Sequence, residues 1–443
     1  MLKNRSIFIL LLWLIAVGQL KLQAQSKNLD LYLLQLESTH PEIIKARLAE
    51  QKSILGIKES RTYYLPDIQF LGSYTMSQGG RRIDLPVGDL LNPVYMSLNK
   101  LNNSNQFTTI ENTSVALLPN NFHDIKFRIT QALYRPELSI NTRIKEVQLN
   151  GQQHQLQQVI RDQKQLFREN YFKYQQIDKS ISIYESKLSV LQEYKRITEK
   201  LLQSGMALPS TLRSVDAQVS MIQAQKNKQV SILTNVRRYL NLALDRNESL
   251  PIEPEENVGL PIPTSYDSKN EVSSEHSQLE QGIQIQTWLL HLEKTFYQPK
   301  IGFQIDLGSQ NYGFKSGPYV LGGLAVELPI WNSGRHKLKK LLVENERNQM
   351  NTQLAWLDSV QYIQKEQLRL SIQSEIDLFQ ASEELVKSYK EILHEVTLKY
   401  KQGVVQHIDV MNALDDLTEA EFEKNNYQFN SWIYFSQWLK LTQ

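Results

Sequence analysis

The stretch YQQIDKSISIYESKLSVL, residues 174–191, is the part of the sequence that decides the fold. Its apolar positions are three and four residues apart in alternation, which is the heptad spacing of a helix that packs along another helix. These positions are Tyr174, Ile177, Ile181, Tyr184, Leu188 and Leu191. The C-terminal half carries a similar pattern at Leu385, Tyr389, Ile392, Val396 and Tyr400. The sequence therefore predicts two long helices that pack as coiled coils.

Each predicted long helix ends at a glycine, and a second helical segment follows it. The first hairpin of helices is predicted over residues 141–244 with its turn at Gly205, and the second over residues 335–441 with its turn at Gly403. Glycine suits these turns because it adopts the left-handed conformation that commonly ends a helix. A helix of about 64 residues is about 95 Å long, so neither hairpin fits a compact globular domain.

The chain contains two copies of one pattern. In each copy a helix ends at a proline, a strand follows, an aromatic residue closes the next strand, and a long helix leads to the glycine turn. Tyr134 and Gly205 are 71 positions apart, and Trp331 and Gly403 are 72 positions apart. This agreement over so long a helix indicates an internal duplication.

The two copies are predicted to occupy residues 25–245 and 276–443. Between them, residues 246–275 contain four prolines, which favours a linker. The first copy carries an insertion of 36 residues between its two strands. Residues 77–122, which contain this insertion, are rich in Gly, Pro and Asn, and we expect them to form a long surface loop.

Four segments alternate between apolar and polar residues, as strands with one buried face do. They are predicted at about residues 67–76, 123–134, 300–312 and 318–330. Each is about ten residues long, the length that a tilted strand needs to cross a bilayer. A soluble, half-buried sheet has the same alternation. Four strands cannot close a membrane barrel alone, so either the sheet is soluble or several chains each contribute four strands.

The composition narrows the classes of function. The 443 residues include 49 Lys and Arg against 47 Asp and Glu, so no basic excess supports binding of nucleic acid. Cys is absent, which excludes disulfides, thiolate metal sites and Cys nucleophiles. Residues 1–24 combine a basic start, a short apolar run and a small residue, Ala24. We expect them to be a secretory signal peptide.

No catalytic constellation is recognisable in the sequence. The eight His residues are scattered, none belongs to a His-Glu-x-x-His motif, and no phosphate-binding loop or dinucleotide fingerprint occurs. His407 lies two residues before Asp409, but no third ligand follows nearby, so a solvated turn is a better interpretation than a metal site. The sequence therefore predicts a protein that is not an enzyme and that uses no cofactor or metal.

These features together resemble the TolC-like outer-membrane efflux proteins. The resemblance covers residues 25–443 and depends on short motifs in a duplicated order. The motifs are His40-Pro41-Glu42-Ile43, Leu65-Pro66 before a strand, Ile330-Trp331-Asn332-Ser333-Gly334 after one, and Tyr400-Lys401-Gln402-Gly403 followed by Ile408-Asp409-Val410. The long loop, with Asp84-Leu85-Pro86-Val87-Gly88, resembles loops in Bacteroidetes members of the family.

The resemblance implies a mainly α fold with a small β part. A homotrimer would combine four transmembrane strands from each protomer into one barrel in the outer-membrane lipid, so that no strand edge is left open. The long antiparallel coiled-coil helices would form a tunnel across the periplasm. The turns at Gly205 and Gly403 would dock a periplasmic adaptor, or membrane fusion protein. An inner-membrane pump of the RND or ABC class would supply the energy, and conduction would be passive and gated.

The resemblance also implies a gate near the second turn. An aspartate ring narrows the tunnel in this family, and Asp409, six residues after Gly403, occupies the corresponding position. Asn412 stands where a second acid is expected, Thr211 is the equivalent of Asp409 in the first copy, and Tyr400 is a further gate contact. Asp409 has a second interpretation, because the helix dipole stabilises an acid at a helix N-terminus.

A different class of function fits part of the sequence. A periplasmic coiled-coil scaffold without a membrane barrel would explain the heptads. It would not explain four alternating segments of bilayer length. Within the favoured class the cargo is open, because drug efflux, metal-ion efflux and protein export share this fold.

Overall fold

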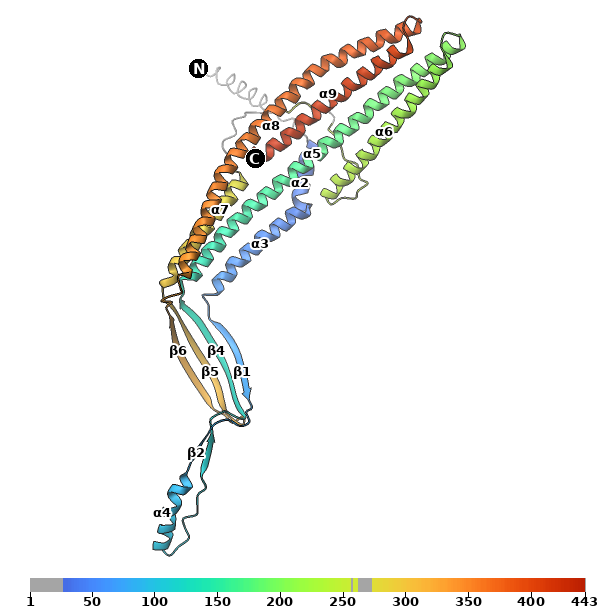
Figure 1. The fold of residues 1–443 in the computed structure, drawn as a ribbon. Coiled ribbons are helices and arrows are strands. Elements are labelled where there is room, and N and C mark those ends of the chain that lie inside the picture. Colours follow the sequence, from blue (N-terminus) through green and yellow to red (C-terminus); the bar gives the residue numbers. More distant parts are fainter. Residues whose placement is uncertain (1–26, 256–257, 262–272, 443) are drawn as a thin grey trace, which may run out of the picture. The chain divides into compact units, whose positions relative to one another are not determined.

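The computed structural model describes residues 27–255, 258–261 and 273–442 (Figure 1). The predicted signal peptide, residues 1–24, lies outside these ranges, as does part of the predicted linker 246–275. The chain divides into two compact units. The helical unit contains the described residues up to Ile54, Val147–Ile285 and those from Glu346 onward, and the strand unit contains Leu55–Glu146 and Gln286–Asn345.

Long helices make up most of the chain. The helices outside the 77–122 region are α2 (Lys27–Thr39), α3 (Pro41–Thr62), α5 (Pro136–Gln203), α6 (Pro209–Ala243), α7 (Ser274–Lys294), the short η1 (Thr295–Tyr297), α8 (Arg335–Lys401) and α9 (His407–Thr442). The two longest, α5 and α8, have 68 and 67 residues. Helix α5 begins at Pro136, before the expected position 141, because a proline in the first turn loses no helical hydrogen bond.

Two apolar clusters hold the helical unit together. The first, here called the tip cluster, joins the four hairpin helices α5, α6, α8 and α9 through residues such as Leu191, Val215, Leu393 and Val410. The second packs α2 against α5, α6 and α9 through Leu36, Tyr171, Leu240 and Phe429. Both clusters combine residues from the two sequence copies, so the core is shared between the copies.

The buried positions of α5 differ in one respect from the predicted heptad seam. Ile177 and Leu188 are buried as predicted, each with 7% of its surface exposed. In the middle of the helix, however, Ile183 is buried at 7%, whereas Ile181 is only half-buried. Helix α5 contacts both α6 and α9 within the tip cluster. Its buried residues therefore form two stripes, and a single heptad seam describes only one contact.

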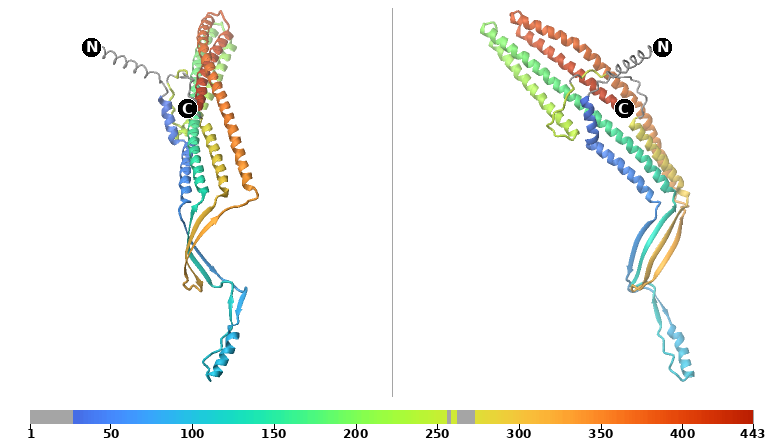
Figure 2. Two further views of the ribbon diagram at one scale, coloured as in Figure 1. Left: turned by 90° about the vertical axis from the view of Figure 1, so that its left-hand side faces the viewer. Right: turned by 180° about the vertical axis from the view of Figure 1, so that it is seen from behind.

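Four antiparallel strands form the main sheet in the order β1-β4-β5-β6 (Figure 2). They are β1 (Asp67–Thr75), β4 (Phe122–Tyr134), β5 (Lys300–Tyr312) and β6 (Pro318–Glu327). Strands β1 and β4 belong to the first sequence copy, and β5 and β6 belong to the second. The pairing of β4 with β5 thus joins the copies, and β1 and β6 are the two outer strands.

One face of this sheet is apolar and exposed. Phe70 pairs with Phe127, Phe127 with Leu307, and Leu307 with Val320, so these four residues form a row across all four strands. Their exposed fractions are 64, 54, 42 and 75% respectively. A soluble sheet would bury such a face against other elements of the chain. The row instead presents aromatic and aliphatic side chains outward.

The region 77–122, predicted as a long surface loop, is mostly exposed but also contains regular secondary structure. This region contains β2 (Arg82–Leu85), α4 (Val87–Leu101) and β3 (Thr113–Ala116). Strands β2 and β3 pair as a separate antiparallel ribbon. The Gly, Pro and Asn content favours a loop, but the side-chain amides of Asn92 and Asn99 donate hydrogen bonds to backbone carbonyls within the region and stabilise its structure.

Candidate functional sites at the helical tips and on the sheet

The two hairpin turns have the same geometry. Gly205 and Gly403 have φ angles of +74° and +72°, in the left-handed region that favours glycine. At the first turn the N–H groups of Gly205 and Met206 donate to the carbonyls of Leu202 and Leu201, at 3.0 and 2.8 Å. This pair of hydrogen bonds is the Schellman motif, which satisfies the last carbonyls of a helix.

The second turn repeats the motif residue by residue. Gly403 N–H donates to the Tyr400 carbonyl and Val404 N–H to the Lys399 carbonyl, both at 3.0 Å. Among the described residues, apart from the glycine and its two chain neighbours, no atom would lie within 4 Å of a Cβ atom added at Gly205 or at Gly403. The glycines are therefore required by the backbone conformation, and the space beside them is open to a binding partner.

Apolar side chains surround these open turns. Met206 and Val404 directly follow the two glycines, and each is 68% exposed. Leu208 and Ile408, at the starts of the returning helices, are 68% and 53% exposed. We call these four residues the tip surface. Exposed apolar residues that gather at one place mark a surface suited to binding another protein.

Asp409 and Thr211 occupy equivalent positions, as the sequence predicts. Each is the third residue of its returning helix, since α6 begins at Pro209 and α9 at His407. The exposed carboxylate of Asp409 accepts a hydrogen bond of 2.8 Å from the backbone N–H of Gln406. An acid that reaches back in this way forms half of a capping box. This contact directly supports the helix-capping interpretation of Asp409. A role of Asp409 in a gate is compatible with it.

The other predicted gate residues lie in different environments. Asn412 is exposed on α9 and Thr211 is half-buried. Tyr400 is only 6% exposed, and its ring packs 4.9 Å from the ring of Tyr194 on α5. Its hydroxyl lies 3.4 Å from that of Thr198. Tyr400 therefore belongs to the tip cluster within one protomer, and this side chain presents little surface to a tunnel.

His407 has a partner that sequence reasoning missed. Its Nδ1 atom lies 2.8 Å from the hydroxyl of Tyr194, and the two rings stack with centroids 5.5 Å apart. Burial lowers the pKa of His407 and raises the pKa of the Tyr194 hydroxyl. Tyr194 follows Leu191 by three residues, so an extension of the heptad count along α5 would have found it.

The suggestion of a metal pair at His407 and Asp409 receives no support. Within the described ranges, no three His, Asp or Glu side chains lie together as a metal site requires.

Among the residues that the structure describes, no helix is both long and apolar enough to cross a membrane.

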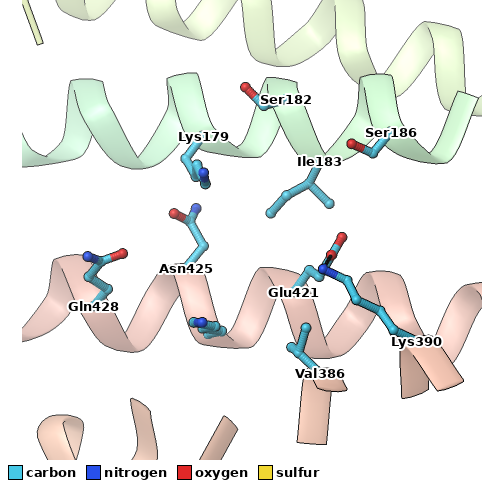
Figure 3. A pocket seen from close by; sticks show the side chains of 10 residues that line it. Lys179, Ser182, Ile183, Ser186, Val386, Lys390, Glu421, Asn425 and Gln428 are labelled. Carbon is cyan, nitrogen blue, oxygen red and sulfur yellow. Dashed lines mark ion pairs between the residues drawn. The ribbon is translucent and has the colours of Figure 1, made fainter. Parts of the chain in front are cut away.

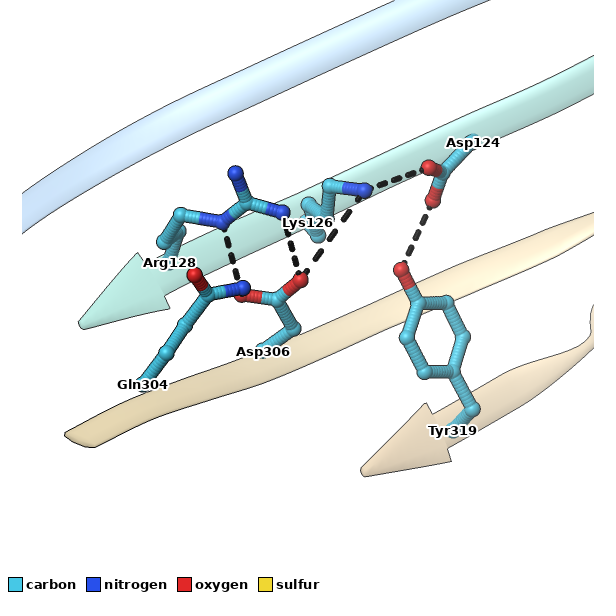
Figure 4. A network of polar contacts seen from close by, with 6 residues as sticks. All are labelled: Asp124, Lys126, Arg128, Gln304, Asp306 and Tyr319. Carbon is cyan, nitrogen blue, oxygen red and sulfur yellow. Dashed lines mark hydrogen bonds and ion pairs between the residues drawn. The ribbon is translucent and has the colours of Figure 1, made fainter. Parts of the chain in front are cut away.

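The polar face of the sheet carries a network of charges (Figure 4). Arg128 on β4 donates two hydrogen bonds, of 2.9 and 2.8 Å, to the carboxylate of Asp306 on β5. Lys126 lies 2.7 Å from Asp124 and 3.9 Å from Asp306. The hydroxyl of Tyr319 on β6 donates to Asp124 at 2.8 Å. Charges of both signs on β4 and β5 thus neutralise one another, and the hydroxyl of Tyr319 extends the network to β6.

Gly308 makes the contact between β6 and β4 possible. It lies on β5 between its partners Lys126 and Tyr319. A Cβ atom there would stand 2.7 Å from Cβ of Lys126 and 3.1 Å from the Tyr319 ring. Alternation predicts that Lys126, Arg128 and Asp306 share a polar face, but the sequence does not reveal which strands pair.

A groove of about 260 Å³ lies among α5, α8 and α9 (Figure 3). Lys179, Lys390 and Lys424 contribute to its lining. Lys390 pairs with Glu421 at 3.0 Å, and Lys424 pairs with Glu383 at 2.9 Å. Since two of these three positive charges already have acidic partners, the groove lacks the character of an anion-binding site.

No protein-family model and no curated protein matches the sequence. Solved structures, in contrast, match it over nearly its whole length. The outer-membrane protein VceC of Vibrio cholerae superposes with a TM-score of 0.74 at 12% identity, covering 94% of this chain and 95% of VceC. CusC, described as forming a transmembrane channel, gives 0.75 at 14% identity, covering 94% and 92%.

A third similar structure is the outer-membrane channel CmeC of Campylobacter jejuni, with a TM-score of 0.74 at 12% identity. It covers 94% of this chain and 85% of CmeC. At such low identity the likeness establishes the fold alone, and it does so over long helices and sheet together. The chain therefore has the fold of the TolC-like outer-membrane channels that its sequence resembles.

Proposed function

We propose that this chain is the protomer of a homotrimeric outer-membrane channel, which serves as the exit duct of a tripartite efflux or export system. The observation that carries the proposal is the exposed apolar row of Phe70, Phe127, Leu307 and Val320 across the sheet. Its opposite face holds the charge network of Arg128 and Asp306. An apolar outer face and a polar inner face are the two surfaces of a water-filled barrel in lipid.

The sheet edges explain why several copies are needed. In the part of the chain that the structure describes, strands β1 and β6 each have a sheet partner on one side only. An unpaired edge has no place in lipid, because nothing there satisfies its backbone hydrogen-bonding groups. Pairing β1 of one copy with β6 of the next closes the sheet, and rotational symmetry then repeats the same contact.

The long helices also carry surface suited to a second copy. Trp356, Ile363 and Leu370 on α8 follow one another at intervals of seven residues and are 70, 63 and 59% exposed. On α3, Leu48 and Leu55 have the same spacing and are 58 and 62% exposed. Apolar residues at this interval form the contact stripe of a coiled coil. In a trimer these stripes would pack between protomers.

The tip surface of Met206, Leu208, Val404 and Ile408 would dock a periplasmic adaptor protein. An inner-membrane pump of the RND or ABC class would act through that adaptor, so the channel itself would conduct passively. Its cargo is a small molecule, a metal ion or a protein. Asp409 would serve as a gate in addition to capping α9, because three copies of it would meet near a threefold axis.

Extraction of the membrane fraction followed by native mass measurement tests this proposal. A trimer that requires detergent for its release is expected, as is channel activity of that trimer in a planar bilayer. Ile363→Asp should weaken the trimer, because it places a charge in the apolar stripe. Gln364→Asp, one exposed position further along the same helix, should leave the trimer intact. A monomer released by high salt would instead support a periplasmic coiled-coil scaffold.

A further inference from the structure

The segment between β1 and β4, residues 76–121 and here called the insert, is held together by asparagine side chains. Asn92 on α4 donates to the Ile110 carbonyl and accepts from the Ile110 N–H, both at 2.8 Å. Asn99 makes the same pair of bonds with Phe107, at 2.8 and 3.1 Å. Seven helical residues rise about 10.5 Å, and three extended residues span about 10 Å. The two amides therefore match the extended chain in register.

Close packing completes the insert. A Cβ atom at Gly88 would stand 2.3 Å from the Ile110 carbonyl oxygen, so the extended chain lies directly against α4. Asp89 and Asn112 add a further reciprocal pair of hydrogen bonds, of 3.1 and 2.9 Å. The insert is thus an ordered structural element, and these contacts determine which face of α4 points outward.

That outward face has the spacing of a coiled coil. The residues Val87, Leu91, Val94, Leu98 and Leu101 follow one another at intervals of four, three, four and three, and we call them the insert seam. Leu91, Val94 and Leu101 are 37, 50 and 81% exposed, and Val87 and Leu98 are half-buried. The asparagines that bind the extended chain occupy a different face of the helix. The seam therefore has the pattern of a helix contact and lies largely open.

The identity of the seam residues indicates the number of helices. The intervals place Leu91 and Leu98 at the a positions and Val87, Val94 and Leu101 at the d positions. Leucine at a with isoleucine at d shifts parallel coiled coils towards three or four helices, and the valines at two of the three d positions are β-branched as isoleucine is. A lipid surface is a poorer partner, because residues 76–121 carry three basic and three acidic side chains and so no net charge for anionic headgroups.

We propose that α4 packs through the insert seam against the same helix of neighbouring copies, so that three inserts form a parallel three-helix cap. This inference depends on the proposed trimeric channel. Threefold rotation makes equivalent helices parallel and puts them in the same register, which is the arrangement that a heptad seam requires. The insert connects the ends of β1 and β4 that face away from the helices. The cap would stand over the outer mouth and restrict passage there.

Cysteine cross-linking of the full-length channel tests the cap, since the chain contains no native Cys. Val94→Cys and Leu101→Cys should each form an intermolecular disulfide under mild oxidation, giving a covalent dimer within the trimer. Met96→Cys is the matched control, because Met96 is 63% exposed but lies on the opposite face of α4. It should link at least tenfold more slowly. Reduction of the Val94→Cys link should raise the conductance in planar bilayers.

Native mass measurement of the same preparations separates the two proposals. A trimer in which Val94→Cys and Met96→Cys link equally, or neither links, overturns the cap and leaves the channel standing. A monomeric preparation overturns both. A fluorophore on Val94→Cys that shifts to the blue in vesicles of outer-membrane lipid, without any cross-link, would assign the seam to lipid and also overturn the cap.

Discussion

The guanidinium of Arg128 lies opposite the carboxylate of Asp306, on paired positions of β4 and β5. It donates two hydrogen bonds, of 2.9 and 2.8 Å, to a residue 178 positions away in the other sequence copy. The side chain of Asp306 is 2% exposed, because Arg128, Lys126 and Gln304 cover it on the polar face. This ion pair links the two halves of the sheet across the pairing of β4 with β5.

Reversal of the charge of either Arg128 or Asp306 should weaken the contact between β4 and β5. Arg128→Asp places three carboxylates close together, with Asp124 and Asp306, and should lower the melting temperature of the channel by a few degrees. Asp306→Arg should do the same beside Lys126. The double swap restores opposite charges at paired positions and should recover most of the loss. Calorimetry of the three variants in detergent measures these effects. If the double variant is no more stable than the summed effects of the two single variants predict, the Arg128–Asp306 pair does not stabilise the channel.

The turn glycines permit a separate test of docking. Gly403→Asn should fold and transport normally, since Asn tolerates a left-handed backbone better than other residues. Gly403→Trp should also fold, because no atom lies within 4 Å of the added Cβ, at a local conformational cost of about 1–2 kcal/mol. Its bulk would, however, block an approaching adaptor. The expected result is a trimer of normal abundance that fails to complement a deletion strain.

Gly205→Trp should have a similar effect if the first turn also docks. Complementation by both Trp variants at normal protein level would show that the turns are not the docking surface.

Asp409 is expected to act at a gate as well as at a helix cap. Asp409→Asn keeps an oxygen that accepts the Gln406 N–H but removes the negative charge. It should therefore preserve the hairpin while abolishing block by divalent cations, which bind carboxylate oxygens. Asp409→Ala should abolish the block and also destabilise the start of α9, by about 1 kcal/mol. Single-channel recording and amide exchange measure the two effects.

The equivalent residue of the first copy supplies the control. Thr211→Ala should leave cation block unchanged, because Thr211 carries no charge. If Asp409→Asn retains wild-type block, Asp409 is a cap alone.

Acid should loosen the hairpin tips. Burial lowers the pKa of His407 below its ordinary value of 6.5, so the folded tip disfavours the protonated ring. The unfolded tip takes up a proton more readily, and stability is therefore complete above about pH 6.5 and declines as the pH falls through the folded pKa. The hydroxyl of Tyr194 contacts the ring, and Asp409 lies two residues further along the chain.

Hydrogen exchange measures this effect. Amides of residues 398–410 should exchange faster at pH 5 than at pH 7.5, after correction for the intrinsic rate. His407→Gln should remove the difference, whereas His394→Gln, at an exposed position on α8, should not. A pH dependence that persists in His407→Gln would assign it to another group.

The sequence determined the local pattern of this fold. Helix periods, strand alternation and the two turn glycines each involve residues only a few positions apart. They can therefore be recognised from the geometry of a single helix or strand. Because both tips obey the same rule, the equivalence of Thr211 and Asp409 was predictable. The helix and strands of the insert were not predicted, since Asn92 and Asn99 resemble loop residues until their hydrogen-bond partners are known.

Only the tertiary structure decided which of these elements meet. Alternation placed Arg128 and Asp306 on polar faces, but two residues 178 positions apart pair only after β4 and β5 align. The burial of Tyr400 against Tyr194 likewise depends on the approach of α8 to α5, which no heptad count within one helix specifies. Sequence periodicity selects the face that a side chain occupies, whereas its partner depends on the register and packing of distant segments, and these are set only when the whole core forms.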